Sequence, residues 1–179
     1  MDIHRAVRLL EATGNTASLF GPQSCYFTVQ TALDRYLQTR TTKRNTCRHG
    51  NYSAVLGILT EDTLVYKEVY VSGRHTTAIA TLLVPKGARI RWQATLLIHY
   101  PGMPNVFRNK ARCSEAKVLA ITGHEGKKYL VGTSDWSRDF KYEVGKTVRP
   151  RYGFKNNHEE CRGGIHFFAT KAEAKGYLS

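Results

Sequence analysis

A succession of short segments rich in β-branched and aromatic residues constrains the fold of this chain more than any other feature. The segments begin after Ser53 and continue to Val148, and turns containing glycine or proline separate most of them. They are Val55–Leu59, Leu64–Val71, Thr77–Val84, Arg89–Tyr100, Lys117–Thr122, Tyr129–Val131 and Lys141–Val148. This pattern predicts a mainly antiparallel sheet.

One of these segments shows a clear alternation. Leu64, Tyr66 and Tyr70 recur at every second position, with Glu68 among them. Successive side chains of a strand point to opposite faces of the sheet. We therefore expect this set of side chains to form one buried face.

The C-terminal segment predicts a turn, a strand and a helix in succession. The pair Gly163-Gly164 permits backbone conformations that side chains disfavour. Ile165–Phe168 is short and mostly apolar, as in a central strand. Thr170 and Glu173 have the spacing of a capping box, so a short helix is expected to begin after Thr170.

Two stretches before the sheet have helical spacing. Apolar residues recur on one face over Ile3–Ala12, and again from Ser24, a good N-cap, to about Arg40. Together these patterns predict an α+β fold, a mainly antiparallel sheet with two N-terminal helices and a short C-terminal helix. We divide the chain into a helical N-terminal segment with a basic arm, residues 1–52, and a β-rich part, residues 53–179, in one compact unit.

The chain is strongly basic. It has 179 residues, with 27 Lys and Arg against 14 Asp and Glu, and a formal net charge of +13. Such an excess attracts polyanions over a long range, although a basic surface that only keeps the protein soluble is the alternative. No apolar run approaches the ~18 residues of a membrane span, and Met1–Arg5 lacks the apolar core of a signal peptide.

Two clusters of cations are the candidate polyanion-binding sites. The first cluster, expected on an exposed arm or loop, contains Arg40, Lys43, Arg44 and Arg48. The second contains Arg108, Lys110, Arg112 and Lys117. Near the second cluster, Tyr100 and Phe107 either stack on unpaired bases or belong to the core. Because no sequence-reading motif is present, we expect largely electrostatic, weakly selective binding.

No arrangement of residues is typical of a known catalytic or metal site. The four cysteines, expected to be reduced, are Cys25, Cys47, Cys113 and Cys161. None has the spacing of a structural zinc site, and no metal or cofactor is predicted. His166 suits acid–base chemistry, and Cys161 could act as a nucleophile with His166 as its base. A hydrogen-bonded core histidine and a buried thiol are the alternatives.

The chain from about Leu64 to Tyr177 resembles a domain of uncharacterised function found in large DNA viruses, often beside pentapeptide repeats. The matching segments include Leu64–Lys67, Leu82–Ala88, Arg112–Leu119, Tyr142–Val148 and Glu160–Phe168. The structural motif of the resemblance consists of Cys161, Gly164, His166, Thr170, Glu173 and Tyr177. This chain has no pentapeptide repeats, and Gln93–Asn109 looks like an insertion. The resemblance implies a viral source and no particular activity.

A second segment is similar to the poly-ADP-ribosyltransferases. Gly164–Phe167, followed by Tyr177, resembles their glycine-isoleucine-tyrosine-phenylalanine segment, and His49-Gly50 resembles their nicotinamide-pocket pair. Ala172 stands where that family has a serine, and more than a hundred residues separate His49 from Gly164. This similarity implies an NAD-using enzyme as the alternative function.

These observations lead to one main hypothesis. The chain is expected to be a non-enzymatic basic viral protein, a virion-associated or accessory module that binds nucleic acid or an acidic protein surface. Its other expected partners are capsid or other virion proteins, and its expected location is the virion or the host-cell cytoplasm. ADP-ribosyl transfer and a structural role in particle assembly are the competing hypotheses.

Overall fold

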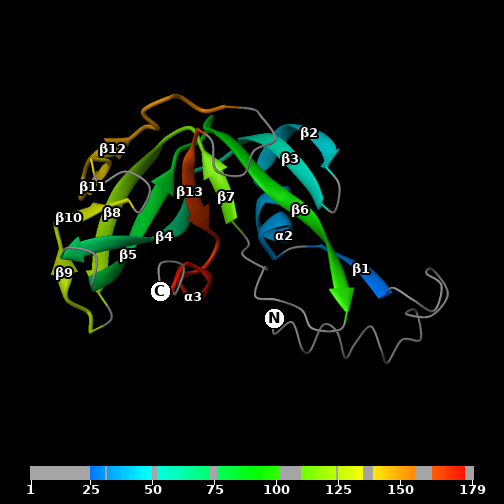
Figure 1. Cartoon of the computed structure of the whole chain (residues 1–179). Coiled ribbons are helices and arrows are strands. Elements are labelled where there is room, and N and C mark those ends of the chain that lie inside the picture. Colours follow the sequence, from blue (N-terminus) through cyan, green and yellow to red (C-terminus); the bar gives the residue numbers. More distant parts are fainter. Residues whose placement is uncertain are drawn as a thin grey trace.

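The structure, a computed structural model, is dominated by one large antiparallel sheet (Figure 1). It describes residues 25–30, 32–49, 52–72, 76–100, 110–123, 125–134, 139–155 and 163–175. Within these segments thirteen strands belong to the sheet, and two short helices accompany them. No helix in the described segments has the length and apolar character needed to cross a membrane.

The elements follow one another through short connections. The first half of the chain contains β1 Cys25–Gln30, α2 Ala32–Gln38, β2 Thr41–His49, β3 Tyr52–Leu59, β4 Thr63–Ser72, β5 Thr76–Val84 and β6 Arg89–Tyr100. The second half contains β7 Lys110–Cys113, β8 Ala116–Gly123, β9 Lys128–Tyr129, β10 Val131–Thr133, β11 Lys141–Glu143, β12 Thr147–Val148, β13 Ile165–Phe168 and α3 Lys171–Ala174.

The predicted α+β fold with two N-terminal helices is wrong. The helix expected from Ser24 to Arg40 is divided: its first part is strand β1, and only the seven residues of α2 are helical. β1 pairs along its whole length with the C-terminal half of β6, from Cys25↔Tyr100 to Gln30↔Thr95. This pairing with a distant strand overrides a local helical spacing in a segment rich in aromatic and β-branched residues. The helix predicted over residues 3–12 lies outside the described residues.

The basic arm predicted after Arg40 is also not a loop. Its residues form β2, which pairs with β3 from Thr41↔Leu59 to His49↔Tyr52, with one irregularity between Thr42 and Asn45. Threonines favour extended backbone, and β3 supplies the hydrogen-bonding edge. The described part of the helical segment 1–52 is therefore mainly strand.

The sheet has the order β12-β8-β5-β4-β13-β7-β6-β3-β2, and one half of it curls back on itself. The β10–β11 hairpin pairs with β4 at Thr133↔Tyr70. The Val144 amide donates to the Leu130 carbonyl at 2.9 Å, and the Gly145 amide donates to the Val118 carbonyl at 2.8 Å. Figure 1 shows β8 to β12 gathered at one side of the molecule, with β1, β2, β3, β6 and α2 at the other.

The core lies on one face of the sheet. On β4 this face consists of Val65, Lys67 and Val69, which are all buried, whereas Leu64 is 43% exposed. The predicted buried face, with Leu64, Tyr66 and Tyr70, is therefore the wrong one. A lysine among the inward positions hid the true alternation from the sequence pattern.

Each helix packs against a different strand group. Helix α2 contacts β6, where the Trp92 indole N–H donates to the Asp34 carboxylate at 2.8 Å inside the core. Helix α3 contacts β4 and β13, and the Lys171 ammonium lies 5.7 Å from the Tyr66 ring centroid. Tyr66 alternates with the core residues of β4, so α3 lies over the opposite face of the sheet.

The predicted C-terminal strand and helix are confirmed. β13 is inserted between β4 and β7, with Phe168↔Tyr66 on one side and Ile165↔Cys113 on the other. The capping box is complete: the Glu173 amide donates to the Thr170 hydroxyl at 3.2 Å, and the Thr170 amide donates to the Glu173 carboxylate at 3.1 Å. α3 has only four residues.

Candidate functional site

The first predicted polyanion cluster has one described side chain, and that side chain is engaged within the protein. Arg40 is partly buried, lies 3.0 Å from the Glu61 carboxylate and stands 4.4 Å from the Tyr36 ring centroid. Its guanidinium also donates to the Tyr36 carbonyl at 2.8 Å. Arg40 therefore holds the junction between α2 and β2. Lys43, Arg44 and Arg48 lie on β2, but their side chains are outside the described residues.

The second predicted cluster is divided between the interior and the surface. Arg112 on β7 is 4% exposed, and Lys110 on the same strand is partly buried. Lys117 on β8 is exposed. Arg108, like Phe107, lies outside the described residues, and of Tyr100 only the backbone is described. A phosphate group can reach Lys117, whereas Arg112 belongs to the folded interior.

The structure gathers a different set of cations at the turns that end several strands. We call this set the basic surface. It consists of Arg89, Lys117, Lys146, Arg149, Arg151 and Lys155, all exposed. Within Arg89, residues 114–117 and residues 144–155, every one of which the structure describes, Glu115 is the one acidic residue. The local charge is therefore strongly positive.

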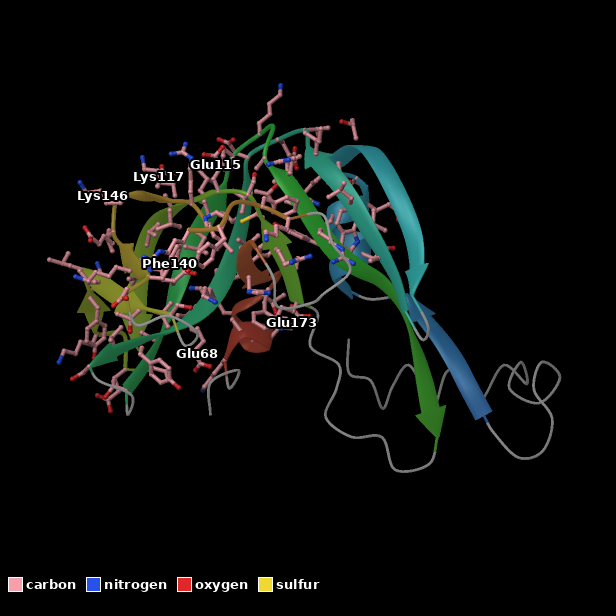
Figure 2. The ribbon with its side chains drawn as sticks, turned by 45° about the horizontal axis from the view of Figure 1, so that its top comes forward. Glu68, Glu115, Lys117, Phe140, Lys146 and Glu173 are labelled. Atoms are coloured by element: carbon pink, nitrogen blue, oxygen red, sulfur yellow. The ribbon has the colours of Figure 1, made fainter. Side chains whose placement is uncertain are left out.

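Printed contacts join these segments into one surface. Lys117 on β8 lies beside β12 in the register Thr147↔Lys117, which places Lys146 next to it. The Arg149 guanidinium lies 2.6 Å from the Glu115 carboxylate. Glu115 follows Ser114, whose hydroxyl accepts the Arg89 amide at 3.0 Å. Figure 2 shows Glu115, Lys117 and Lys146 close together, away from Glu68 and Glu173.

Aromatic side chains accompany the cations of this surface. Tyr152 is 78% exposed, and the Arg151 guanidinium lies 5.9 Å from its ring centroid. The Arg89 guanidinium lies 5.3 Å from the ring centroid of Phe154, which is partly buried. Cations beside exposed rings can contact both the phosphates and the bases of a nucleic acid.

Sequence reasoning found one member of the basic surface, Lys117, and missed the others. The segment Arg149–Lys155 contains three cations and two aromatic residues within seven positions, and this was the available signal. Its Pro150 and Gly153 identified it only as a turn. The proximity of Lys117, Lys146 and Arg89 depends on strand pairing between distant segments, which composition does not reveal.

Of the predicted motif residues in the C-terminal segment, the described ones have structural positions. Gly164 has φ of +156°, and a β-carbon there would lie 2.8 Å from Cβ of Arg112. His166 is partly buried on β13, opposite Arg112 in the register. Cys161 and Tyr177 are outside the described residues, so the Cys161–His166 pair stays a prediction.

The segments that resemble the ADP-ribosyltransferases lie on different strands. His49 ends β2 at one edge of the sheet, and Gly164 immediately precedes β13. Three strands, β7, β6 and β3, lie between β13 and β2. Neighbouring strands are about 4.8 Å apart, so this arrangement spans roughly 19 Å of sheet.

The interior contains one group of titratable side chains. The Lys67 ammonium lies 5.7 Å from the ring centroid of Tyr142, and the Cys113 thiol donates a weak hydrogen bond to the Ile165 carbonyl at 3.7 Å. Burial raises the pKa of the Cys113 thiol and of the Tyr142 hydroxyl. Both groups are therefore neutral near pH 7, and a buried neutral thiol is a poor nucleophile.

Among the residues that the structure describes, no three His, Cys, Asp or Glu side chains are grouped in a way that could hold a metal ion. The described His166 and Cys113 sit on neighbouring strands β13 and β7, and both are explained by their packing. The arrangement that offers chemistry to a partner is the basic surface.

Comparison with known proteins identifies a family for this chain. No curated protein and no solved structure matches it. A family model does match residues 42–174, which is most of the chain. The matched range contains β3 to β13, α3 and the whole basic surface. The chain therefore belongs to a family of unknown function, DUF5758.

Proposed function

We propose that this protein is a non-enzymatic binding module that engages nucleic acid through the basic surface. The observation that supports this most directly is the spatial grouping of six exposed cations from four separate turns and strand ends, with one acidic residue among them. Such a surface attracts phosphates and raises the rate of association. The formal net charge of +13 adds a long-range attraction of the same sign.

Binding at this surface should be mainly electrostatic. Lysine and arginine side chains that contact phosphates release condensed counterions, so the affinity falls as the salt concentration rises. Glu115 neutralises part of the charge of Arg149, and the remaining cations lie free of printed ion pairs on the surface side. Turns do not enter a groove as a recognition helix does, so we expect weak sequence selectivity.

The decisive experiment is a binding titration against a salt series. Fluorescence anisotropy with labelled oligonucleotides gives the dissociation constant and its dependence on salt. The test variant is Lys117→Ala combined with Lys146→Ala, which removes two neighbouring exposed cations. Its slope of log affinity against log salt should fall by about 1.4 for a single strand, at ~0.7 for each lost phosphate contact.

The matched control removes the same charge elsewhere. Lys128 and Lys175 are exposed and lie on β9 and just after α3, outside the basic surface. The double variant Lys128→Ala and Lys175→Ala should leave the slope nearly unchanged. Equal losses in the two double variants would show a non-specific effect of net charge. Absence of binding at low salt would reject nucleic acid as the partner and favour an acidic protein surface.

ADP-ribosyl transfer stays a prediction from sequence similarity. An NAD-binding site would raise the melting temperature of the protein by mass action. A thermal-shift titration with millimolar NAD tests this directly. A clear rise, reduced in a His49→Ala variant, would favour the enzyme over the binding module.

The viral resemblance supports a further part of the proposal. We propose that the protein comes from a large DNA virus and works in the virion or the host-cell cytoplasm, where nucleic acid and virion proteins are available partners. The support is the similarity of Tyr142–Val148 and the segment around Gly164 to the viral domain. Mass spectrometry of purified particles tests the virion association, and its absence from particles would favour an accessory role in the cell.

A further inference from the structure

We infer that the basic surface binds unpaired nucleic acid in preference to a duplex, because Tyr152 provides a stacking platform for a base. This inference rests on the proposed function and specifies its ligand. The Tyr152 side chain is 78% exposed, an unusual position for a large aromatic ring. Among described large apolar side chains, Leu130 is equally exposed but lies outside the basic surface.

The backbone around Tyr152 holds the ring in a defined position. The Gly153 amide donates to the Pro150 carbonyl at 3.0 Å, which closes a turn with Arg151 and Tyr152 at its tip. Gly153 has φ of +71°, a value that glycine adopts without strain. The ring of Pro150 restricts its own backbone as well. Tyr152 therefore projects from a constrained turn.

The turn is also tied to the sheet on its C-terminal side. The Lys155 amide donates to the Gly163 carbonyl at 3.2 Å, directly before β13. Phe154 is partly buried beneath the Arg89 guanidinium, with 5.3 Å between the guanidinium carbon and the ring centroid. Phe154 thus anchors the turn, whereas Tyr152, on the other side of Gly153, faces the solvent. The two rings have different roles.

The chemistry of this tip distinguishes single strands from duplexes. An exposed ring can stack on the face of a base only when that base is not already stacked and paired. Arg151, 5.9 Å from the ring centroid, is placed to contact a phosphate next to the stacked base. A duplex has the higher charge density and still binds electrostatically. It offers no free base face, except at its ends.

Stacking on an aromatic ring tolerates every base, because each base has a π face. The expected ligand is therefore a single strand of DNA or RNA with little sequence preference. For one stacked base, the loss of the ring should weaken binding by about tenfold. The salt dependence should not change, since no phosphate contact is removed.

The experiment compares Tyr152→Ala, Tyr152→Phe and Leu130→Ala. The probes are an oligothymidine single strand, an abasic strand of the same length and a hairpin duplex with closed ends. Tyr152→Ala should lose about tenfold in affinity for the oligothymidine strand and almost nothing for the abasic strand and the duplex. Tyr152→Phe keeps a stacking ring and should bind like the unmodified protein. Leu130→Ala, which removes an equally exposed apolar side chain, should have no effect.

The outcomes separate this inference from the proposed function. Suppose that the unmodified protein binds none of the probes, even at low salt: both the proposed function and the inference are then rejected. If all probes bind and the lysine variants weaken them, but Tyr152→Ala loses nothing or loses equally on duplex and single strand, only the inference is rejected. Because the Tyr152 ring is exposed, circular dichroism of the variants should match that of the unmodified protein.

Discussion

The cations of the sheet interior and those of the basic surface contribute equally to the net charge but have different consequences. Lys67, Arg91 and Arg112 are 7%, 7% and 4% exposed, and all three lie on strands near the middle of the sheet. Lys146, Arg151 and the other members of the basic surface lie on turns and strand ends, in contact with solvent. Only the second group can meet a phosphate without unfolding the protein.

This difference shows why net charge is a poor guide to a binding site. Arg91 and Arg112 pair across β6 and β7 in the register Arg91↔Arg112. Arg112 also faces the backbone of Gly164, at a distance that leaves no room for a side chain. A charge buried in this way makes its interactions within the fold. Its removal should affect stability, whereas removal of a surface cation should affect binding.

The largest expected effect is the loss of a buried cation. Arg112→Ala should lower the free energy of unfolding by about 3 kcal/mol, because the groups that surround a buried charge lose their partner. Arg151→Ala, at the exposed turn, should change it by less than about 0.5 kcal/mol. Urea unfolding of both variants measures the contrast. Similar values for the two would mean that burial does not separate the two groups.

The second prediction concerns the space that Arg112 needs. Gly164→Ala places a β-carbon 2.8 Å from Cβ of Arg112, at a backbone angle of φ +156° that disfavours side chains. We expect a destabilisation of about 2 kcal/mol from overpacking and strain. Gly126→Ala is a suitable comparison, since φ there is +77° but no atom lies within 4 Å of the added carbon. Equal losses would assign the effect to backbone strain alone.

A third prediction increases the charge of the basic surface instead of reducing it. Glu115→Gln removes the acidic partner of Arg149, from which it is separated by 2.6 Å. One freed phosphate contact should raise the affinity for a single strand about fivefold at 0.1 M salt and steepen the salt dependence by about 0.7. Stability should change little, because the Arg149 side chain is 70% exposed. An unchanged affinity would place the ligand elsewhere.

The smallest expected effect is a change in alkaline stability. Burial raises the pKa of the Tyr142 hydroxyl in the folded protein, whereas in the unfolded chain it ionises near 10.0. Stability is therefore fully present below pH 10 and is lost as the pH rises above that value. Tyr142→Phe removes this contribution, so urea unfolding at pH 8 and pH 10.5 should differ less in the variant. Cys113, also buried, contributes a similar loss above about pH 9 in both proteins.

Several elements could be predicted because their signals are local. The strands β3, β4, β5, β6 and β8 match the predicted β-rich segments to within a few residues, and the Thr170–Glu173 capping box was recognisable from its spacing. Lys141–Val148 was expected as one strand but contains the turn at Gly145, whose φ is +85°. A glycine at such an angle ends one strand and begins another.

The errors occur where distant segments decide the conformation. Cys25–Gln30 has helical spacing but is a strand, because β6 offers it a hydrogen-bonding edge. Lys110–Cys113 was interpreted as part of a basic cluster, yet it is β7, enclosed between β6 and β13. The basic surface escaped prediction for the same reason, since Arg89, Lys117 and Lys146 are far apart in the chain.

The sequence by itself determined the β-rich character of the chain, most strand positions, the capped C-terminal helix and the excess of positive charge. These properties depend on side-chain type and on spacing over a few residues. The tertiary structure alone decided which cations are buried, which ones meet at the turns and which aromatic ring stays in solvent. Strand order and register set these outcomes, because they join backbone edges and side chains across long sequence separations.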